Sequence, residues 1–153
     1  MSRRDQIRMT EQEVVEFIAQ RRTVVLASTK QDGRPHLVPM WFVPDGQVIE
    51  LWSFGKAQKT LNLRRDPRAT LLLETGDSYD QLRGVSLECD VELLDDPAEV
   101  ERIGAALTER YAGGALDEQG REAVRAQVPK RVGMRFTPTR VISWDHRKLG
   151  GAY

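Results

Sequence analysis

Several segments of the chain show the apolar or alternating pattern of β-strands. The clearest is 84–94, where apolar residues alternate with polar ones, so that one face of the strand packs in a core and the other meets water. The segment 23–29 is rich in β-branched residues, which favour a buried strand. Further strands are predicted at residues 35–43, 47–54, 69–74, 132–136 and 140–144.

Turn residues indicate how the first of these strands connect. Gly33 and Gly46 can each adopt a positive φ, and they fall between the first, second and third predicted strands. These short turns predict an antiparallel meander for the strands between residues 23 and 54. Near the other end of the chain, the segment Thr137-Pro138-Thr139 is predicted to separate the last two strands.

Helix signals alternate with the strands. Thr10 and Glu13 form a capping-box pattern at the start of a helix that ends near Arg21. The other predicted helices lie between Gly55 and Asp66, from 97 to about 111 and from 116 to 127. This order predicts a single, mainly β domain over residues 1–153, namely a small antiparallel β-barrel of six or seven strands with peripheral α-helices.

Composition narrows the class of protein. Lys and Arg together number 23, as do Asp and Glu, so net charge gives no argument for a large polyanionic partner. The Arg3-Arg4 and Arg64-Arg65 pairs lie among acids and lack aromatic platforms, so we expect no nucleic-acid partner. No apolar run is long enough to span a bilayer or to act as a signal segment. We therefore expect a cytoplasmic protein that does not associate with membranes.

Reactive side chains are few. Cys89 is the single cysteine and falls among core positions of a strand, and His36 and His146 lack further ligands at metal spacing, so we expect neither a disulfide nor a metal site. The chain contains no Gly-x-Ser-x-Gly elbow, Walker loop or Gly-x-Gly-x-x-Gly fingerprint. A bound organic cofactor is then the economical way for such a chain to carry out chemistry.

The stretch between the strands 48–54 and 69–74 offers a place for such a cofactor. Lys56, Lys59 and Thr60 fall on one face near the start of the short helix that follows Gly55. A helix N-terminus presents unpaired N–H groups and the positive end of the helix dipole, so this face can seat an anion such as a phosphate. A solvated, lysine-bearing helix without any ligand gives the same pattern, and the spacing alone leaves both interpretations open.

The segment 35–43 is a second candidate. It is apolar on both faces over its second half, and Pro39 cannot donate to a strand ladder, so this position marks an edge or an interruption of the sheet. Backbone groups freed there could face a flat ring. Ordinary core packing of Val38 and Trp41 explains the same apolar character.

The chain resembles the pyridoxamine 5'-phosphate oxidase-like split-barrel superfamily, and within it the branch of F420- or FMN-dependent oxidoreductases. The resemblance is carried by the capped helix, the strand 23–29, the turn 32–35, the segment 41–43 and, most specifically, the run Lys-Thr-Leu-Asn-Leu-Arg-Arg-Asp-Pro-Arg at 59–68. It covers about residues 10–145.

The resemblance implies a homodimer of six-stranded antiparallel split barrels with two cofactors at the subunit interface. It implies that the cofactor phosphate sits against Ser53, Lys56, Lys59 and Thr60, and that Asn62 supports the helix.

The resemblance also implies that Pro39, Met40 and Trp41 lie along the cofactor ring, and that the second subunit closes the pocket with its C-terminal part, for which Trp144 is a candidate. The chain departs from genuine pyridoxamine phosphate oxidases, because its tail from 143 to 149 does not reproduce their arginine–histidine substrate motif. Oxidation of vitamin B6 is therefore not expected.

Three functions remain at this stage. The first is F420-dependent hydride transfer to an unsaturated small molecule, with Arg34, Arg64 or Arg65 near the acidic tail of the cofactor. The second is an oxidoreductase that holds FMN in the same seat, and the third is a carrier of a flavin, F420 or haem-like ligand without turnover. No catalytic residue stands out. His36 and Tyr79 are candidate proton donors, although a surface histidine and a loop tyrosine explain the same residues.

Overall fold

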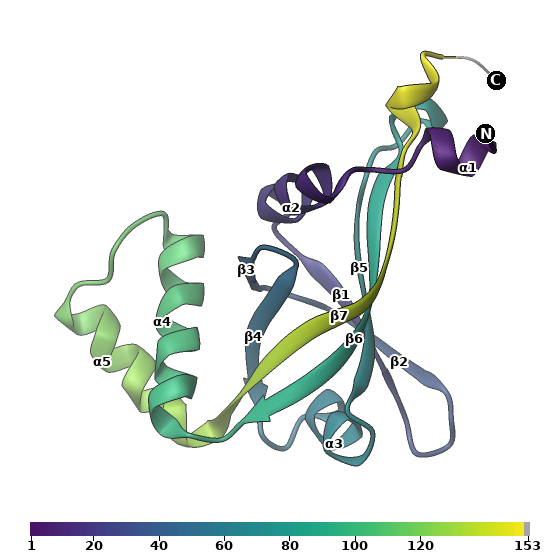
Figure 1. Ribbon diagram of the computed structural model, residues 1–153. Coiled ribbons are helices and arrows are strands. Elements are labelled where there is room, and N and C mark those ends of the chain that lie inside the picture. The colour runs from purple at the N-terminus through teal and green to yellow at the C-terminus, as the bar shows by residue number, and fades with distance from the viewer. Residues whose placement is uncertain (152–153) are drawn as a thin grey trace.

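The computed structural model describes residues 1–151 and contains one antiparallel sheet that curls into an open barrel (Figure 1). The order of the seven strands in the sheet is β2-β1-β5-β6-β7-β4-β3, so β2 and β3 are its two edges. The strands are β1 (Val24–Thr29), β2 (Pro35–Met40), β3 (Val43–Asp45), β4 (Val48–Phe54), β5 (Arg68–Thr75), β6 (Arg83–Leu94) and β7 (Arg131–Asp145). The predicted mainly β, split-barrel fold is confirmed, with seven strands in place of six.

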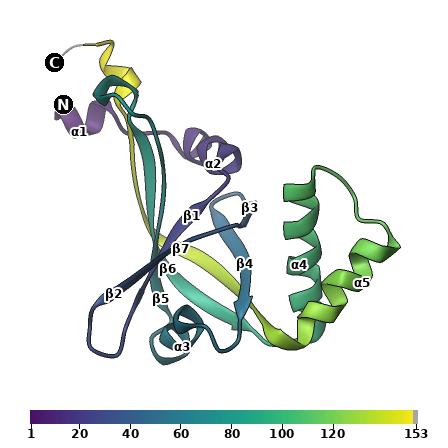
Figure 2. The same cartoon turned by 180° about the vertical axis from the view of Figure 1, so that it is seen from behind.

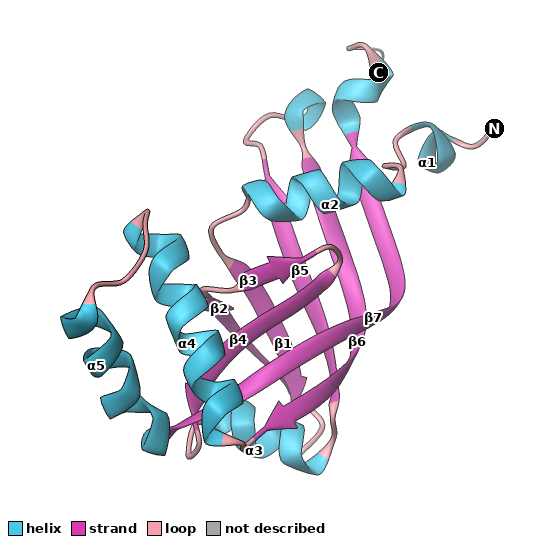
Figure 3. Cartoon of the chain, turned by 60° about the vertical axis from the view of Figure 1, so that its left-hand side comes forward, coloured by secondary structure: helices cyan, strands magenta, loops and turns pink. Residues whose placement is uncertain are grey.

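Helices lie at both ends of the barrel and along one side of it. In Figure 3, α2 lies across the strands near one end of the barrel, and in Figure 2, α3 lies beyond the opposite end, while α4 and α5 stand beside β4. None of the helices among residues 1–151 is long and apolar enough to cross a membrane. The helices are α1 (Arg3–Gln6), α2 (Glu11–Gln20), α3 (Gln58–Arg65), α4 (Pro97–Ala112) and α5 (Glu118–Gln127), and the short 3-10 helices are η1 (Tyr79–Gln81), η2 (Val128–Lys130) and η3 (His146–Leu149).

The last two predicted strands are a single strand, β7, which corrects the predicted break at 137–139. Its pairing with β6 shifts by one residue, because Glu88 pairs with Arg140 while Cys89 pairs with Pro138. Thr139 is the extra residue of this bulge, and its hydroxyl donates to the Glu88 carbonyl at 3.1 Å. The bulge absorbs the missing N–H of Pro138, so the strand continues where the local sequence predicts a stop.

The predicted meander is also wrong, because β4 pairs with β3 and β7 and not with β2. The segment 35–43 breaks after Met40, and the chain crosses from one edge of the sheet to the other. Phe42 is fully buried at this crossing, and its backbone N–H donates to the Tyr111 hydroxyl at 3.1 Å. Its carbonyl accepts from Arg110 at 2.7 Å. Helix α4 therefore satisfies the backbone groups that a longer strand would have satisfied.

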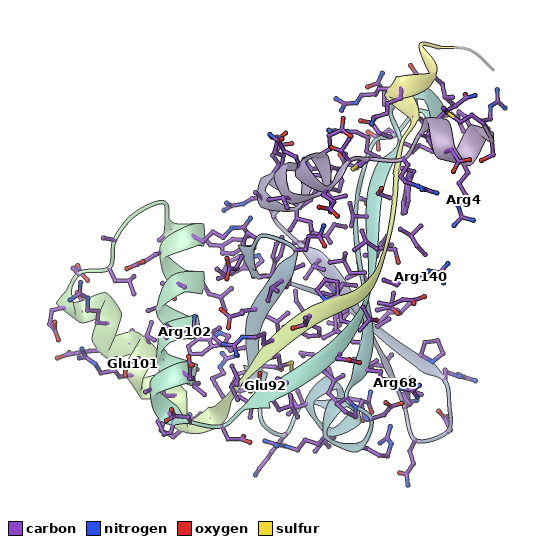
Figure 4. The ribbon with its side chains drawn as sticks, viewed as in Figure 1. Arg4, Arg68, Glu92, Glu101, Arg102 and Arg140 are labelled. Carbon is purple, nitrogen blue, oxygen red and sulfur yellow. The ribbon has the colours of Figure 1, made fainter. Side chains whose placement is uncertain are left out.

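A buried carboxylate ties α4 to the barrel. The Glu50 side chain on β4 is 10% exposed, and its carboxylate accepts hydrogen bonds from two guanidinium nitrogens of Arg102 on α4 at 3.0 and 2.8 Å. Arg135 on β7 donates to the same carboxylate at 3.1 Å. Figure 4 shows Arg102 on the side of α4 that faces the strands. The hydrogen bonds from Arg102, followed by its charge and by Arg135, hold the pKa of Glu50 below its usual value.

We expect Glu50→Gln to lower the free energy of unfolding at pH 7 by about 1–3 kcal/mol, because it leaves two arginines without their shared charge. The contribution of a carboxylate with a depressed pKa is fully present above its unfolded value of about 4.3 and is lost as the pH falls through the folded value. Urea unfolding between pH 7 and pH 3 should therefore show a weaker pH dependence in the variant. Glu88→Gln is the control, since its ion pair with Arg140 is exposed and long at 3.5 Å. Equal effects of both substitutions would contradict this account.

Candidate functional site

The turn between β4 and α3 is held by backbone hydrogen bonds to η2 and within the turn itself. The Gly55 N–H donates to the Lys130 carbonyl at 3.0 Å, and the Ala57 N–H donates to the Phe54 carbonyl at 3.1 Å. The Thr60 hydroxyl donates to the same Phe54 carbonyl at 2.7 Å. The Thr60 side chain is fully buried, so this geometry favours a role in holding the turn over a direct contact with a ligand.

The Asn62 side chain connects α3 to strand β1 of the barrel. Its side chain is fully buried, and its amide donates to the Ser28 hydroxyl on β1 at 3.1 Å. Its carbonyl oxygen accepts from the Gln58 amide at 2.7 Å, one helical turn earlier. Asn62 therefore supports the helix, as the resemblance implies, and it does so through buried hydrogen bonds.

The N-terminus of α3 differs from those of the longer helices in its cap. Thr10, Asp96 and Asp117 cap α2, α4 and α5 with side-chain oxygens, whereas Ala57 caps α3 and offers no such acceptor. The N–H groups of the first turn of α3 thus have no side-chain cap, and they can receive an anion. Lys56 precedes this turn and Lys59 lies within it, so the predicted positive face is present, although Lys56 lies outside the helix itself.

Arg131 adds a further cation that the sequence reading missed. It pairs with Phe54 across β4 and β7, and its guanidinium carbon lies 3.7 Å from the centroid of the Phe54 ring and 4.9 Å from that of Trp52. Burial, and then the charge of Arg131, lower the pKa of Lys59, and burial lowers the pKa of Arg131 itself. Among residues 1–151, no carboxylate forms an ion pair with Lys56, Lys59 or Arg131. Neighbouring cations without a counter-charge fit an anionic ligand.

Ser53 lies on the other face of β4. Side chains alternate along the strand, so Ser53 shares the inward face with Leu51, whereas Trp52 and Phe54 share the outward face. The Ser53 hydroxyl is buried and has no hydrogen-bond partner within the described part of the chain. A buried hydroxyl without a partner is uncommon, and it marks a place where a ligand or water could complete the bonding.

An open pocket of about 680 Å³ lies beside Trp52 and Arg131. One wall is formed by the segment Pro39–Trp41, and Trp52 and Arg131 line it from β4 and β7. Helix α4 also lines the pocket, through Leu107, Thr108, Tyr111 and Ala112. Pro39 lies in the edge strand β2, as its missing N–H predicts. The structure therefore gathers the predicted ring contacts Pro39, Met40 and Trp41 with Arg131, at the border of the positive region.

Other predicted residues lie elsewhere in the chain. Trp144 is near the end of β7 opposite to Arg131, where its ring lies against Gly84. Tyr79 is at that same end, and the Nδ1 atom of His146 lies 2.8 Å from its carbonyl oxygen. Neither Trp144 nor Tyr79 therefore reaches the lysines of its own chain, and a contribution of Trp144 from a second subunit stays a prediction.

The remaining candidates are held to different degrees. Arg64 forms an ion pair with Asp95 at 2.6 Å, and Arg65 donates to the Thr29 carbonyl, while Arg34 is exposed on the turn between β1 and β2. The Nδ1 atom of His36 is buried without a hydrogen-bond partner among residues 1–151.

The fold and this site define a split barrel with a positively charged helix start beside an aromatic pocket. The family model for pyridoxamine 5'-phosphate oxidase matches residues 10–145. The chain belongs to this family.

Solved structures agree with the assignment to this family. A conserved hypothetical protein from Mycobacterium tuberculosis is 44% identical, with a TM-score of 0.90 over 100% of this chain and 95% of that one. An F420 reductase is 27% identical, with a TM-score of 0.62 over 82% of this chain and 93% of that one. The haem storage protein HutZ from Vibrio cholerae shares the fold at 17% identity and a TM-score of 0.68, over 87% of this chain and 94% of that one.

We expect Lys59→Met to leave the free energy of unfolding of the ligand-free protein unchanged or to raise it by up to about 1 kcal/mol. The reason is that folding partly buries this amine next to Arg131, which disfavours its charged form at pH 7. Denaturant unfolding measures the effect, with Arg121→Met on the exposed face of α5 as the control. A loss of more than about 1 kcal/mol would show that Lys59 is a structural residue.

Proposed function

We propose that the protein is an F420-dependent oxidoreductase that reduces an unsaturated small molecule. The observation that carries this proposal is a group of cations that have no carboxylate partner within residues 1–151, namely Lys56 and Lys59 at the uncapped start of α3 and Arg131, which lines the pocket. Membership of the family and the likeness to an F420 reductase support it. We do not propose oxidation of vitamin B6, the activity after which the family is named, because the tail of this chain does not reproduce the C-terminal motif of those enzymes.

The residues present fit the phosphate of such a cofactor. Lys56 and Lys59 would bind it with charge-assisted hydrogen bonds, which are about twice as strong as neutral ones, together with the N–H groups of the first turn of α3. Asn62 and Thr60 hold that turn in place from beneath. Ser53 stays a predicted contact, to be made by its buried hydroxyl.

The ring would lie along the backbone of Pro39 and Met40, in the open pocket. When bound, it supplies a hydride to one carbon of the acceptor's double bond, while a proton from solvent completes the other carbon. The chain contributes placement and exclusion of water. Phe42 and Tyr111 fix the backbone next to this segment, so the edge of β2 is rigid where the ring would meet it.

FMN is the second candidate cofactor, since it carries the same ribityl phosphate and would use the same cations. The two differ in the acidic tail of F420, which needs further positive charge. Arg34 is exposed on a turn and could supply this charge. Arg64 forms an ion pair with Asp95, and both side chains are exposed. Such a pair contributes about 0–1 kcal/mol, so Arg64 could exchange Asp95 for the acidic tail of the cofactor.

A titration of the purified protein with F420, followed by absorbance and fluorescence, tests the proposal. We expect saturable binding, and we expect Lys59→Met and Lys56→Met each to weaken it by about 10- to 100-fold, the equivalent of one charge-assisted hydrogen bond. Arg121→Met should bind as the parent protein does. Binding of FMN and not F420 would select the second candidate.

Turnover decides between an enzyme and a carrier. With reduced cofactor and a panel of enones and quinones, we expect reoxidation of the cofactor that depends on the acceptor. A protein that binds the cofactor tightly and never reoxidises it with any acceptor would be a carrier.

We further propose that the active form is a homodimer, with Trp144 of one chain near the pocket of the other. Sedimentation equilibrium should give twice the chain mass of 17.4 kDa. A Trp144→Ala variant should still sediment as a dimer and should lose affinity for the cofactor. A monomer that binds the cofactor fully would contradict this part of the proposal.

A further inference from the structure

The Trp41 side chain forms an aromatic surface next to the backbone of Pro39 and Met40, along which the cofactor ring is proposed to lie. The ring of Trp41 stacks on that of Tyr111, with centroids 4.4 Å apart and an interplanar angle of 6°. Trp41 is nevertheless 60% exposed. One face of the indole is therefore covered by Tyr111, and the rest of the side chain is open to the pocket that it lines.

This stack is held in place before any ligand binds. The Tyr111 hydroxyl accepts from the Phe42 N–H at 3.1 Å and donates to the Arg22 carbonyl at 2.7 Å. The guanidinium carbon of Arg22 lies 4.4 Å from the centroid of the Tyr111 ring. Because Trp41 takes one face of that ring, Arg22 takes the other. The column Arg22–Tyr111–Trp41 is thus supported from behind and ends in an open aromatic face.

The lining of the pocket is mostly uncharged. Of the nine residues that line the pocket, one, Arg131, carries a charge. On α4, the Thr108 hydroxyl donates to the Gly104 carbonyl at 2.8 Å, which leaves its methyl group for an apolar contact. Ala112 is small and exposed at the end of the helix, so it leaves space in the pocket that a larger side chain would fill.

Helix α4 is held in place beside the pocket. Gly104 lies so close to β4 that a Cβ atom there would approach the Trp52 ring to 2.2 Å. Arg110 bonds to the Phe42 carbonyl at 2.7 Å and to the Arg21 carbonyl at 2.8 Å, and it thereby anchors the C-terminal end of α4. The position of α4 beside the pocket is therefore set by packing against Trp52 and by hydrogen bonds from Arg110.

From this geometry we infer that the pocket takes a flat, conjugated and largely uncharged acceptor, which stacks on the open face of Trp41 and is limited in size by α4 at Ala112. The inference rests on the proposed function, in that the acceptor is reduced beside a ring held at Pro39 and Met40. Flat aromatic surfaces stack in offset geometry with a gain beyond the area buried, whereas a puckered molecule of equal size cannot make that contact.

The test compares two alcohols of matched skeleton, 1-naphthol, which is flat, and decahydro-1-naphthol, which is saturated and puckered. Binding is followed by the indole N–H signals of the three tryptophans in ¹⁵N-labelled protein, with that of Trp41 assigned by Trp41→Phe. We expect 1-naphthol to shift the Trp41 signal saturably and to bind at least about tenfold more tightly than the saturated alcohol.

Two variants locate the site. Ala112→Phe should weaken 1-naphthol binding by about tenfold, because the new ring takes space that the ligand uses, and in the cofactor-loaded enzyme it should raise KM. Ala115→Phe is the matched control, since Ala115 is exposed three residues further on and does not line the pocket. Trp41→Ala should abolish the preference for the flat alcohol.

The outcomes separate the two proposals. Equal affinity for both alcohols, an unchanged Trp41 signal, or no effect of Ala112→Phe would overturn the inference. If the naphthol results hold and neither F420 nor FMN binds, the proposed function fails and the aromatic subsite stands. If a cofactor binds and 1-naphthol does not, the subsite fails alone.

Discussion

Two hydrogen bonds made by buried side chains of α3 hold the helix start at which the candidate site lies. Thr60 bonds to the carbonyl at the end of β4, and Asn62 bonds to Ser28 on β1, so the helix start cannot shift without breaking one of them. The lysines owe their position to these contacts, because a flexible lysine side chain reaches a fixed anion only if its backbone is fixed first. The pair also explains why Ser28, Thr60 and Asn62 can be buried: each of these polar side chains has a hydrogen-bond partner that fixes its direction.

The second constraint is the attachment of α4. The segment between β6 and β7 leaves the sheet, forms α4 and α5, and returns to the strand that carries Arg131. Glu50 anchors α4 to the side of the barrel through Arg102, and Arg110 anchors its C-terminal end to the crossing between β2 and β3. The pocket thus lies between an edge of the sheet and a helix fastened at two points, an arrangement that keeps its shape in the absence of a ligand.

The cations of the candidate site lower the stability of the ligand-free protein. Lys59 and Arg131 each lose solvent on folding, and neither has a carboxylate partner within residues 1–151. Ion pairs are formed elsewhere in the chain, as with Arg102 and Arg135 around Glu50, so the shortage is local. A charge left without a counter-charge at one place, in a chain with equal numbers of acids and bases, is what an anionic ligand would require.

Local patterns in the sequence determined the strands, the capped helices and the positive start of α3, since alternation, capping and turn chemistry act over a few residues. The motif at 59–68 also led to the right family. Only the tertiary structure decided how these parts meet. It broke the segment 35–43 at Phe42, whose backbone groups bond to α4, and it joined the last two strands through a bulge at Thr139. It also turned the Thr60 hydroxyl inward and brought Arg131 next to Phe54. These outcomes depend on strand register and on partners that are distant in the chain, and no pattern of neighbouring residues records them.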